Sequence, residues 1–210
     1  KETLEKDRLA HQEKLREAAY LKEFIHRNPH ISISIECQST NETLKLLDDD
    51  KIDIGLIGKP ASLKTFNFYY LDNIEDIFVT TMDYLLNLSA LGVKNSEILQ
   101  NSTLMLLDKG NMTRKYIDDY LQENQIHVKD SIDISNMDLL IDFAKIGVGV
   151  ACVIKSIVSK ELADGTLIEI PLGIPIHKRE VGFAYKESSK LSTSLQTFIK
   201  FYESYTPEDF

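Results

Sequence analysis

Helix-like and strand-like patterns alternate along most of this 210-residue chain, and this alternation limits the possible folds more than any other feature. Near the start, apolar residues at helical spacing over residues 18–29 lead into HISISIEC, residues 30–37, which alternates as a strand does. A second helical stretch over residues 39–50 leads into KIDIGLIG, residues 51–58. This order implies parallel strands joined by right-handed crossovers, so an α/β fold is predicted.

The stretch KIDIGLIG is almost continuously apolar and then halts at Gly58, Lys59 and Pro60. Its alternation is poor, which argues against a strand with one face in water. A parallel strand that helices cover on both faces has such a sequence. We therefore expect a central strand here, preceded by a solvated acidic turn at residues 48–50.

The same alternation returns in the second half of the chain. Residues 62–100 are less regular, and there we expect only a strand near EDIFVTTM, residues 75–82, followed by short turns. Two α/β units with a crossover near residues 78–100 suggest two lobes that flank a cleft. The later strands are expected at residues 102–108, 130–135, 148–154, 167–172 and 179–187, and the later helices at residues 111–124, 137–147, 155–165 and 192–205.

Charge and composition exclude several classes of protein. The net charge is −9, and the 24 Lys and Arg residues are spread along the chain, which argues against a surface for nucleic acid or anionic membrane. No apolar run approaches the ~20 residues of a spanning helix, and the charged start has no signal-peptide pattern. The two cysteines, Cys37 and Cys152, lie in strand-like apolar stretches that favour buried free thiols. We expect a reduced, cytoplasmic protein.

Four polar turns follow predicted strands, and ligands of open parallel sheets bind at the carboxyl ends of strands. Three of these turns also begin a helix, where free backbone N–H groups and the positive end of the dipole favour an anion. The candidate ligand-binding residues are Gln38, Ser39 and Thr40 in the first turn, Gly58, Lys59 and Pro60 in the second, Asn111 and Thr113 in the third, and Asn136 in the fourth.

Each candidate also has a plainer interpretation. Ser39 or Thr40 is expected to cap a helix even without a ligand, and so is Asn111. Lys59 would be ordinary as a surface lysine. Arg114 either contacts a ligand or lies on the surface.

No cofactor, metal site or catalytic site is predicted. The five histidines are scattered without the spacing of metal ligands, and the GVG at residues 147–149 lacks the GxGxxG frame of dinucleotide binding. There is no GxSxG and no cysteine beside a histidine in the sequence. We therefore expect a binding module and not an enzyme.

Three stretches, in their order and spacing, resemble the effector-binding regulatory domain of LysR-type transcriptional regulators over roughly residues 20–204. Residues 21–60 resemble the family's run of helix, strand, small polar turn, helix and a strand of the form G-x-hydrophobic-D-hydrophobic. Residues 110–121, GNMTRKYIDDYL, resemble its G-S-x-x-R turn into a helix. Residues 135–172 resemble the stretch with L-hydrophobic-x-x-G-x-G-hydrophobic and E-L-x-x-G-x-L.

The resemblance implies a fold like that of type 2 periplasmic binding proteins, with two Rossmann-like lobes and a central cleft. Residues 1–18 would be a linker helix or tail, residues 19–80 and 178–210 would form lobe I, and residues 81–177 would form lobe II. A small-molecule effector, an anion or carboxylate, would bind in the cleft of a homodimer or homotetramer. DNA would be contacted only by an N-terminal winged helix-turn-helix that these residues lack, and the family's usual first strand before the first helix is missing too.

The leading hypothesis is therefore an effector-sensing domain of a transcriptional regulator. A free-standing solute-binding protein of the same fold is the alternative, and it would need an export signal. An enzyme on an α/β scaffold is a third hypothesis, which no paired acid–base motif supports.

Overall fold

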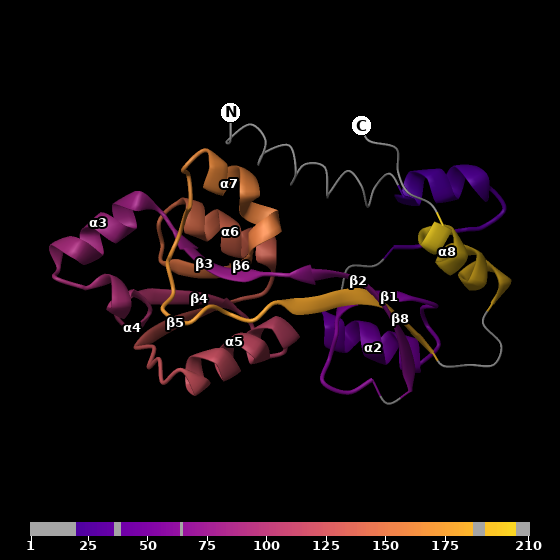
Figure 1. The fold of residues 1–210 in the computed structure, drawn as a ribbon, viewed down its shortest axis with the longest axis horizontal. Coiled ribbons are helices and arrows are strands. Elements are labelled where there is room, and N and C mark those ends of the chain that lie inside the picture. Colours follow the sequence, from indigo (N-terminus) through magenta and orange to yellow (C-terminus); the bar gives the residue numbers. More distant parts are fainter. Residues whose placement is uncertain (1–19, 36–38, 64, 187–191, 205–210) are drawn as a thin grey trace. The chain divides into compact units, whose positions relative to one another are not determined.

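The structure is a computed structural model that describes residues 20–35, 39–63, 65–186 and 192–204 (Figure 1). The chain divides into two compact units, here called unit 1 (Lys1–Tyr70 and Gly182–Phe210) and unit 2 (Leu71–Val181). The expected linker helix or tail, residues 1–18, and the candidate Gln38 lie outside the described residues.

Unit 2 is built on a five-stranded sheet with the strand order β5-β4-β6-β3-β7. β4 is parallel to both of its neighbours, β5 and β6, while β3 is antiparallel to β6 and β7. β3 lies in unit 2, while the lobe boundaries expected from the sequence stay a prediction. The strands are β3 (Asp76–Thr80), β4 (Thr103–Leu107), β5 (Asp130–Ile134), β6 (Val150–Ile154) and β7 (Ile168–Glu169).

Helices cover both faces of this sheet, because its strand residues alternate between two apolar clusters. Leu104 and Leu106 of β4 pack in one cluster with residues of α3, α4 and α5, whereas Met105 and Leu107 pack in the other with residues of α6. The α/β expectation is thus confirmed for unit 2. The helices are α3 (Met82–Ala90), α4 (Ile98–Asn101), α5 (Met112–Glu123), α6 (Met137–Lys145) and α7 (Ser159–Ala163), with short 3₁₀ turns at η1 (Asn95–Glu97) and η2 (Lys155–Val158).

Unit 1 holds a three-stranded sheet with the order β1-β8-β2, and both β2 and β8 continue past the division into unit 2. Its core combines Leu47 and Ile57 with Ala184, and Phe24 packs edge-on against Phe198 and Phe201. The elements are a helix over residues 20–27, α2 (Thr40–Asp48), β1 (Gly55–Gly58), β2 (Phe66–Ile74), β8 (Arg179–Lys186) and α8 (Thr193–Ser204).

The prediction of a central strand at KIDIGLIG is wrong. β1 contains only four residues and lies at an edge of the described sheet. Ile57 is buried while the side chain of Leu56 is 50% exposed, so one face of the strand is in water. The strand expected at residues 30–37 is not formed over its described part either, since residues 32–35 have no regular secondary structure and Ile35 is 72% exposed. An alternating sequence becomes a strand only where another strand pairs with it.

The expectation for residues 62–100 is also incomplete. The strand near EDIFVTTM is confirmed as β3, but β2 was missed, and the short turns expected after β3 are instead the helix α3. Thr81 caps α3 by accepting a hydrogen bond from the backbone N–H of Tyr84. Leu86 of this helix is exposed, so the apolar residues of α3 do not mark a single buried face. The spacing of apolar residues in the sequence therefore gives only a weak helix signal here.

Candidate functional site

The third and fourth candidate turns lie side by side in unit 2. β4 and β5 are parallel and in register, with Leu107 opposite Ile134, so the turns that follow them leave the same edge of the sheet. The backbone N–H of Asp108 donates to the carbonyl of Ile134 across 3.0 Å and joins the two turns directly. α5 begins after one turn and α6 after the other, on opposite faces of the sheet. Two helix N-termini therefore flank one pair of strand ends (Figure 1).

The candidate asparagines in these turns both cap helices. Asn111 Oδ1 accepts from the N–H of Thr113 at 2.8 Å, and Asn136 Oδ1 accepts from the N–H of Leu139 at 2.9 Å. The turn before α5 is tightened further, because the N–H of Gly110 donates to the Asp108 carboxylate at 3.1 Å. A carboxylate beside the α5 N-terminus is part of the electrostatics that any ligand here would meet.

Arg114 is not a surface residue, so that interpretation is wrong, whereas ligand contact by Arg114 stays a prediction. Its side chain is only 6% exposed. Nε donates to Asp118, and Nη1 donates to both Asp133 and the carbonyl of Leu107. Burial lowers the pKa of the guanidinium, but the two carboxylates outweigh burial and the pKa ends above its ordinary value. The charge of Arg114 is thus matched inside the protein and locks the ends of β4 and β5 to α5.

The first and second candidate turns belong to unit 1. Ser39 is the N-cap of α2, with its Oγ accepting from the N–H of Glu42, and Thr40 is the first residue of that helix. Gly58 ends β1, and the ammonium of Lys59 lies 5.6 Å from the centre of the Phe68 ring, with Pro60 following. The capping interpretation of Ser39 is confirmed, whereas ligand contact by any of these residues remains a prediction.

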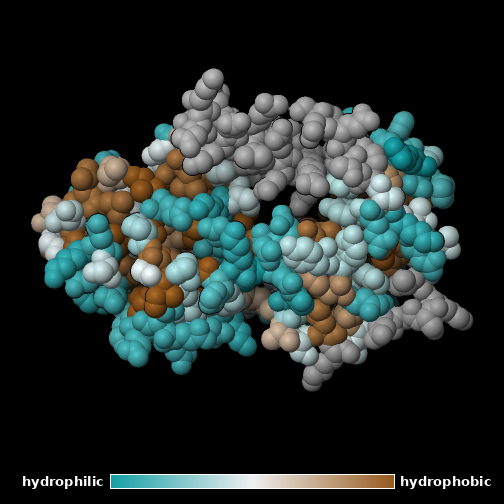
Figure 2. Space-filling view, in the orientation of Figure 1, coloured by the Kyte–Doolittle hydropathy of each residue, from teal (hydrophilic) through white to brown (hydrophobic). Residues whose placement is uncertain are grey.

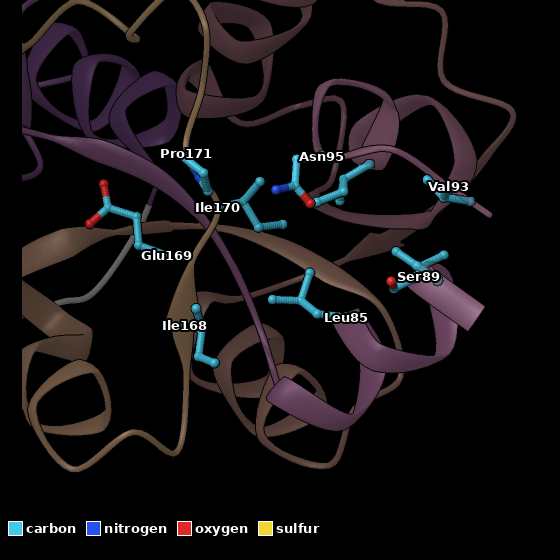
Figure 3. A pocket seen from close by; sticks show the side chains of 10 residues that line it. Leu85, Ser89, Val93, Asn95, Ile168, Glu169, Ile170 and Pro171 are labelled. Atoms are coloured by element: carbon cyan, nitrogen blue, oxygen red, sulfur yellow. The ribbon is translucent and has the colours of Figure 1, made fainter. Parts of the chain in front are cut away.

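A separate pocket of about 130 Å³ opens in unit 2 between α3 and the segment around β7 (Figure 3). Glu169 is the charged residue that lines it, and its carboxylate is held by Lys155 at 3.0 Å. Because no cationic side chain is among the described lining residues, the pocket gives an anion no positively charged partner. Pockets for metabolite-sized ligands are about 300–1,000 Å³. The lining residues are Leu85, Leu88, Ser89, Val93, Asn95, Ile98, Ile168, Glu169, Ile170 and Pro171.

Apolar side chains also gather on the outer surface beside this pocket. Figure 2 shows hydrophobic residues over α3, where Met82 and Leu86 are exposed, and Leu91 just after the helix is exposed too. Such a surface suits neither an anion nor a metal ion. Over the residues that the structure describes, no group of three or more His, Cys, Asp or Glu could hold a metal ion, and no helix is long and apolar enough to cross a membrane.

Comparisons with known proteins agree in pointing to one family. The family model described as the LysR substrate binding domain matches residues 18–206. The chain is 25% identical over 86% of its length to the HTH-type transcriptional activator CmpR of Synechocystis, covering 59% of that protein. It is 21% identical over 87% of its length to the HTH-type transcriptional regulator YeiE of Escherichia coli K12, covering 61%. The chain therefore spans about three fifths of the length of these relatives.

Solved structures show the same fold at lower identity. The regulatory domain of Synechocystis CcmR in complex with 2-PG matches with a TM-score of 0.76 at 18% identity, over 90% of this chain and 89% of that one. The effector-binding domain of QuiR in complex with shikimate matches with a TM-score of 0.72 at 16% identity, over 88% and 87%. The BenM effector-binding domain with benzoate gives 0.67 at 16% identity, over 91% and 88%.

These matches confirm the fold class expected from the sequence, a type 2 periplasmic-binding-protein-like α/β fold. They also confirm the resemblance carried by residues 21–60, 110–121 and 135–172, since the family model covers all three stretches. The chain belongs to the LysR substrate-binding domain family.

Proposed function

We propose that this chain is the effector-binding regulatory domain of a cytoplasmic LysR-type transcriptional regulator. It senses a small anionic metabolite and controls a DNA-binding domain outside these residues, as part of a homodimer or homotetramer. The observation that carries the proposal is the convergence of the α5 and α6 N-termini on the joined ends of β4 and β5. Helix N-termini present unpaired N–H groups and favour negative charge.

The ligands named for the solved relatives support this choice of chemistry. Benzoate and shikimate, which occupy BenM and QuiR, are carboxylates. The proposed contacts in unit 2 are Asn111, Thr113 and Asn136, whose turns meet at the sheet edge. The proposed contacts in unit 1 are Gln38, Ser39, Thr40, Gly58, Lys59 and Pro60.

Signalling would follow from differential binding. A ligand shifts a conformational equilibrium only by the difference between its affinities for the two states. An effector held at these turns would favour one state of the domain, and that state would present the DNA-binding segments of the oligomer differently. The acidic net charge of −9 agrees with DNA contact lying outside these residues.

A thermal-shift screen of carboxylates, phosphate esters and sulfur oxyanions tests the proposal. Binding raises the melting temperature by mass action, by the equivalent of about 2.7 kcal/mol at a hundredfold excess over Kd. Ser39→Ala should abolish or shrink the shift for a compound that binds. Thr81→Ala is the matched control, because Thr81 caps α3 in the same way but lies outside the proposed contacts.

Two results would reject the proposal. The first is a shift that Ser39→Ala and Thr81→Ala reduce equally, which would remove Ser39 from the site. The second is a reading frame with an export signal upstream in place of a winged helix-turn-helix, which would favour the free-standing solute-binding protein. Turnover of a bound compound would instead revive the enzyme hypothesis.

A further inference from the structure

Two acidic residues face two basic residues where the chain enters and leaves unit 2. Glu75 pairs with Lys178 at 3.4 Å, and Asp76 pairs with Arg179. The second pair is bidentate, with Arg179 Nε donating to Asp76 Oδ2 at 2.6 Å and Nη2 donating to Oδ1 at 2.8 Å. The Asp76 side chain is fully buried and that of Arg179 is 13% exposed. The outgoing and returning segments are therefore held together inside unit 2.

The body of unit 2 anchors this double pair. Lys155, which follows β6 and begins η2, binds the Glu75 carboxylate at 3.2 Å and that of Glu169 at 3.0 Å, and its backbone N–H donates to the Glu75 carbonyl at 2.9 Å. Removing one partner from a buried ion pair leaves an uncompensated charge, so such a pair resists opening. Bidentate geometry adds directional rigidity. The segments at residues 75–76 and 178–179 thus move with the sheet and with each other.

The helix α5 is tied to the same place. The Tyr116 hydroxyl donates to the carbonyl of His177 at 2.7 Å, and the Arg179 guanidinium lies 5.4 Å from the centre of the Tyr116 ring. Burial, and then the negative charge of Asp76, raise the pKa of Tyr116, so the phenol keeps its proton and stays a donor. Five residues before Tyr116 stands Asn111, about 7.5 Å along a rigid helix at 1.5 Å per residue.

We propose that Tyr116 and Arg179 are positioning residues that couple the α5 end of the candidate effector site to the two segments linking unit 2 to unit 1. The inference rests on the proposed function for its meaning, because α5 carries the proposed contacts Asn111 and Thr113. A shift of the α5 first turn reaches Arg179 through the helix and Tyr116. It passes to Asp76 through the buried ion pair and therefore acts on both segments together.

Hydrogen exchange in a double-mutant cycle tests the coupling without any ligand. Asn111→Ala removes the α5 cap and should speed exchange of the amides of residues 75–77 and 178–181 by about fivefold, since a cap is worth a few-fold to tenfold in helix opening. Arg179→Lys keeps the positive charge but loses the bidentate pair of hydrogen bonds to Asp76. In the Arg179→Lys background the effect of Asn111→Ala on residues 75–77 should fall to less than twofold.

Asn136→Ala is the matched control for the cycle, because Asn136 caps α6 through the same kind of bond but α6 has no such tie to Arg179. Distant sites without shared partners give additive effects, so this second cycle with Arg179→Lys should be additive. Equal behaviour of the two cycles, or no effect of Asn111→Ala on the linking segments, overturns the proposal.

Two milder variants test the same coupling in case Arg179→Lys destabilises unit 2 as a whole. Tyr116→Phe removes only the bond to His177, whereas Tyr120→Phe removes the matching bond from the same helix to the carbonyl of Ile174. Only Tyr116→Phe should reduce the effect of Asn111→Ala on the exchange rates of the amides of residues 178–181. Equal loss in both variants would mean that packing of α5, and not this contact, carries the effect. These outcomes do not depend on whether an effector is ever found, so they are separate from the test of the proposed function.

Discussion

Replacing Arg114 by Leu should destabilise unit 2 by about 2–4 kcal/mol. The substitution keeps a buried apolar stem and removes the guanidinium. It deletes the bonds to Asp118 and Asp133 and leaves the Leu107 carbonyl without the donor that Arg114 supplies. Hydrogen bonds to charged groups contribute about 1.5–3 kcal/mol each, and an orphaned buried acceptor costs about 1–3 kcal/mol.

The exposure of the two carboxylates sets the upper limit of this estimate. Asp118 is 46% exposed and Asp133 is 42% exposed, so water can solvate both when the guanidinium is gone. The cost should therefore stay below the full ~3–5 kcal/mol of breaking a buried pair. Most of the loss should come from Leu107, whose carbonyl lies in the buried region at the end of β4.

Urea unfolding followed by far-UV circular dichroism measures the change, with the midpoint expected to fall and the slope m to stay constant. Lys145→Leu is the control in the same unit, because its 3.5 Å pair with Glu161 is partly exposed and should be worth less than ~1 kcal/mol. Raising the salt concentration should erase the small difference at Lys145 and leave most of the loss at Arg114. A loss at Arg114 no larger than that at Lys145 would refute the reasoning.

Other predictions concern packing, pH and thiol reactivity. Gly149→Ala should cost about 1–3 kcal/mol in thermal unfolding, because a Cβ there would lie 2.3 Å from the Thr103 carbonyl oxygen and force β4 and β6 apart. Burial raises the pKa of Glu75, but the hydrogen bond from Lys155 and other basic contacts outweigh it and the pKa ends below its ordinary value. Glu75 therefore adds stability above its unfolded pKa and loses it as the pH falls, so Glu75→Gln should flatten the decline in unfolding free energy from about pH 5 to 3. Burial raises the pKa of Cys152 well above its ordinary value, so a thiol reagent should label it only in urea, as peptide mapping would show.

Each of these has a result that would count against it. Gly173→Ala, where nothing lies within 4 Å of the new Cβ, should change the melting temperature little. If Gly149→Ala lowered the melting temperature no more than Gly173→Ala does, the packing argument would be contradicted. An unchanged pH profile in Glu75→Gln would mean that its ion pairs add no stability. Rapid labelling of Cys152 in the folded protein would contradict its burial.

Much of unit 2 could be predicted because its signals are local. The strands β4 and β6 were expected from short apolar runs, β5 from its alternating sequence, and α5 and α6 from apolar spacing. A cap forms between residues two or three apart, which explains why the cap at Asn111 could be expected before any tertiary contact was known, although the cap at Asn136 was not expected. Gly165, the last residue of the helix expected at residues 155–165, has a φ of +78° just after α7, which is typical of a helix end.

For the same reason, the candidate site could be predicted only in part from the sequence. Polar turns after strands are visible in a sequence, and the parallel register of β4 and β5 then brings two of them together. The role of Arg114 was missed because it depends on Asp133, nineteen residues away and on a different element. The pairing of Asp76 with Arg179, 103 residues apart, left no pattern that a short window could show.

The sequence by itself determined most of the alternating elements of unit 2, the caps at Ser39 and Asn111, and the family, since these rest on residues close together or on their order along the chain. Tertiary structure alone decided that β1 is an edge strand, that residues 32–35 form no strand, and that β3 belongs to unit 2. The physical reason is that strand pairing and burial are set by partners far along the chain. The local sequence limits which secondary structures a segment can form, and its tertiary contacts determine which of them it adopts.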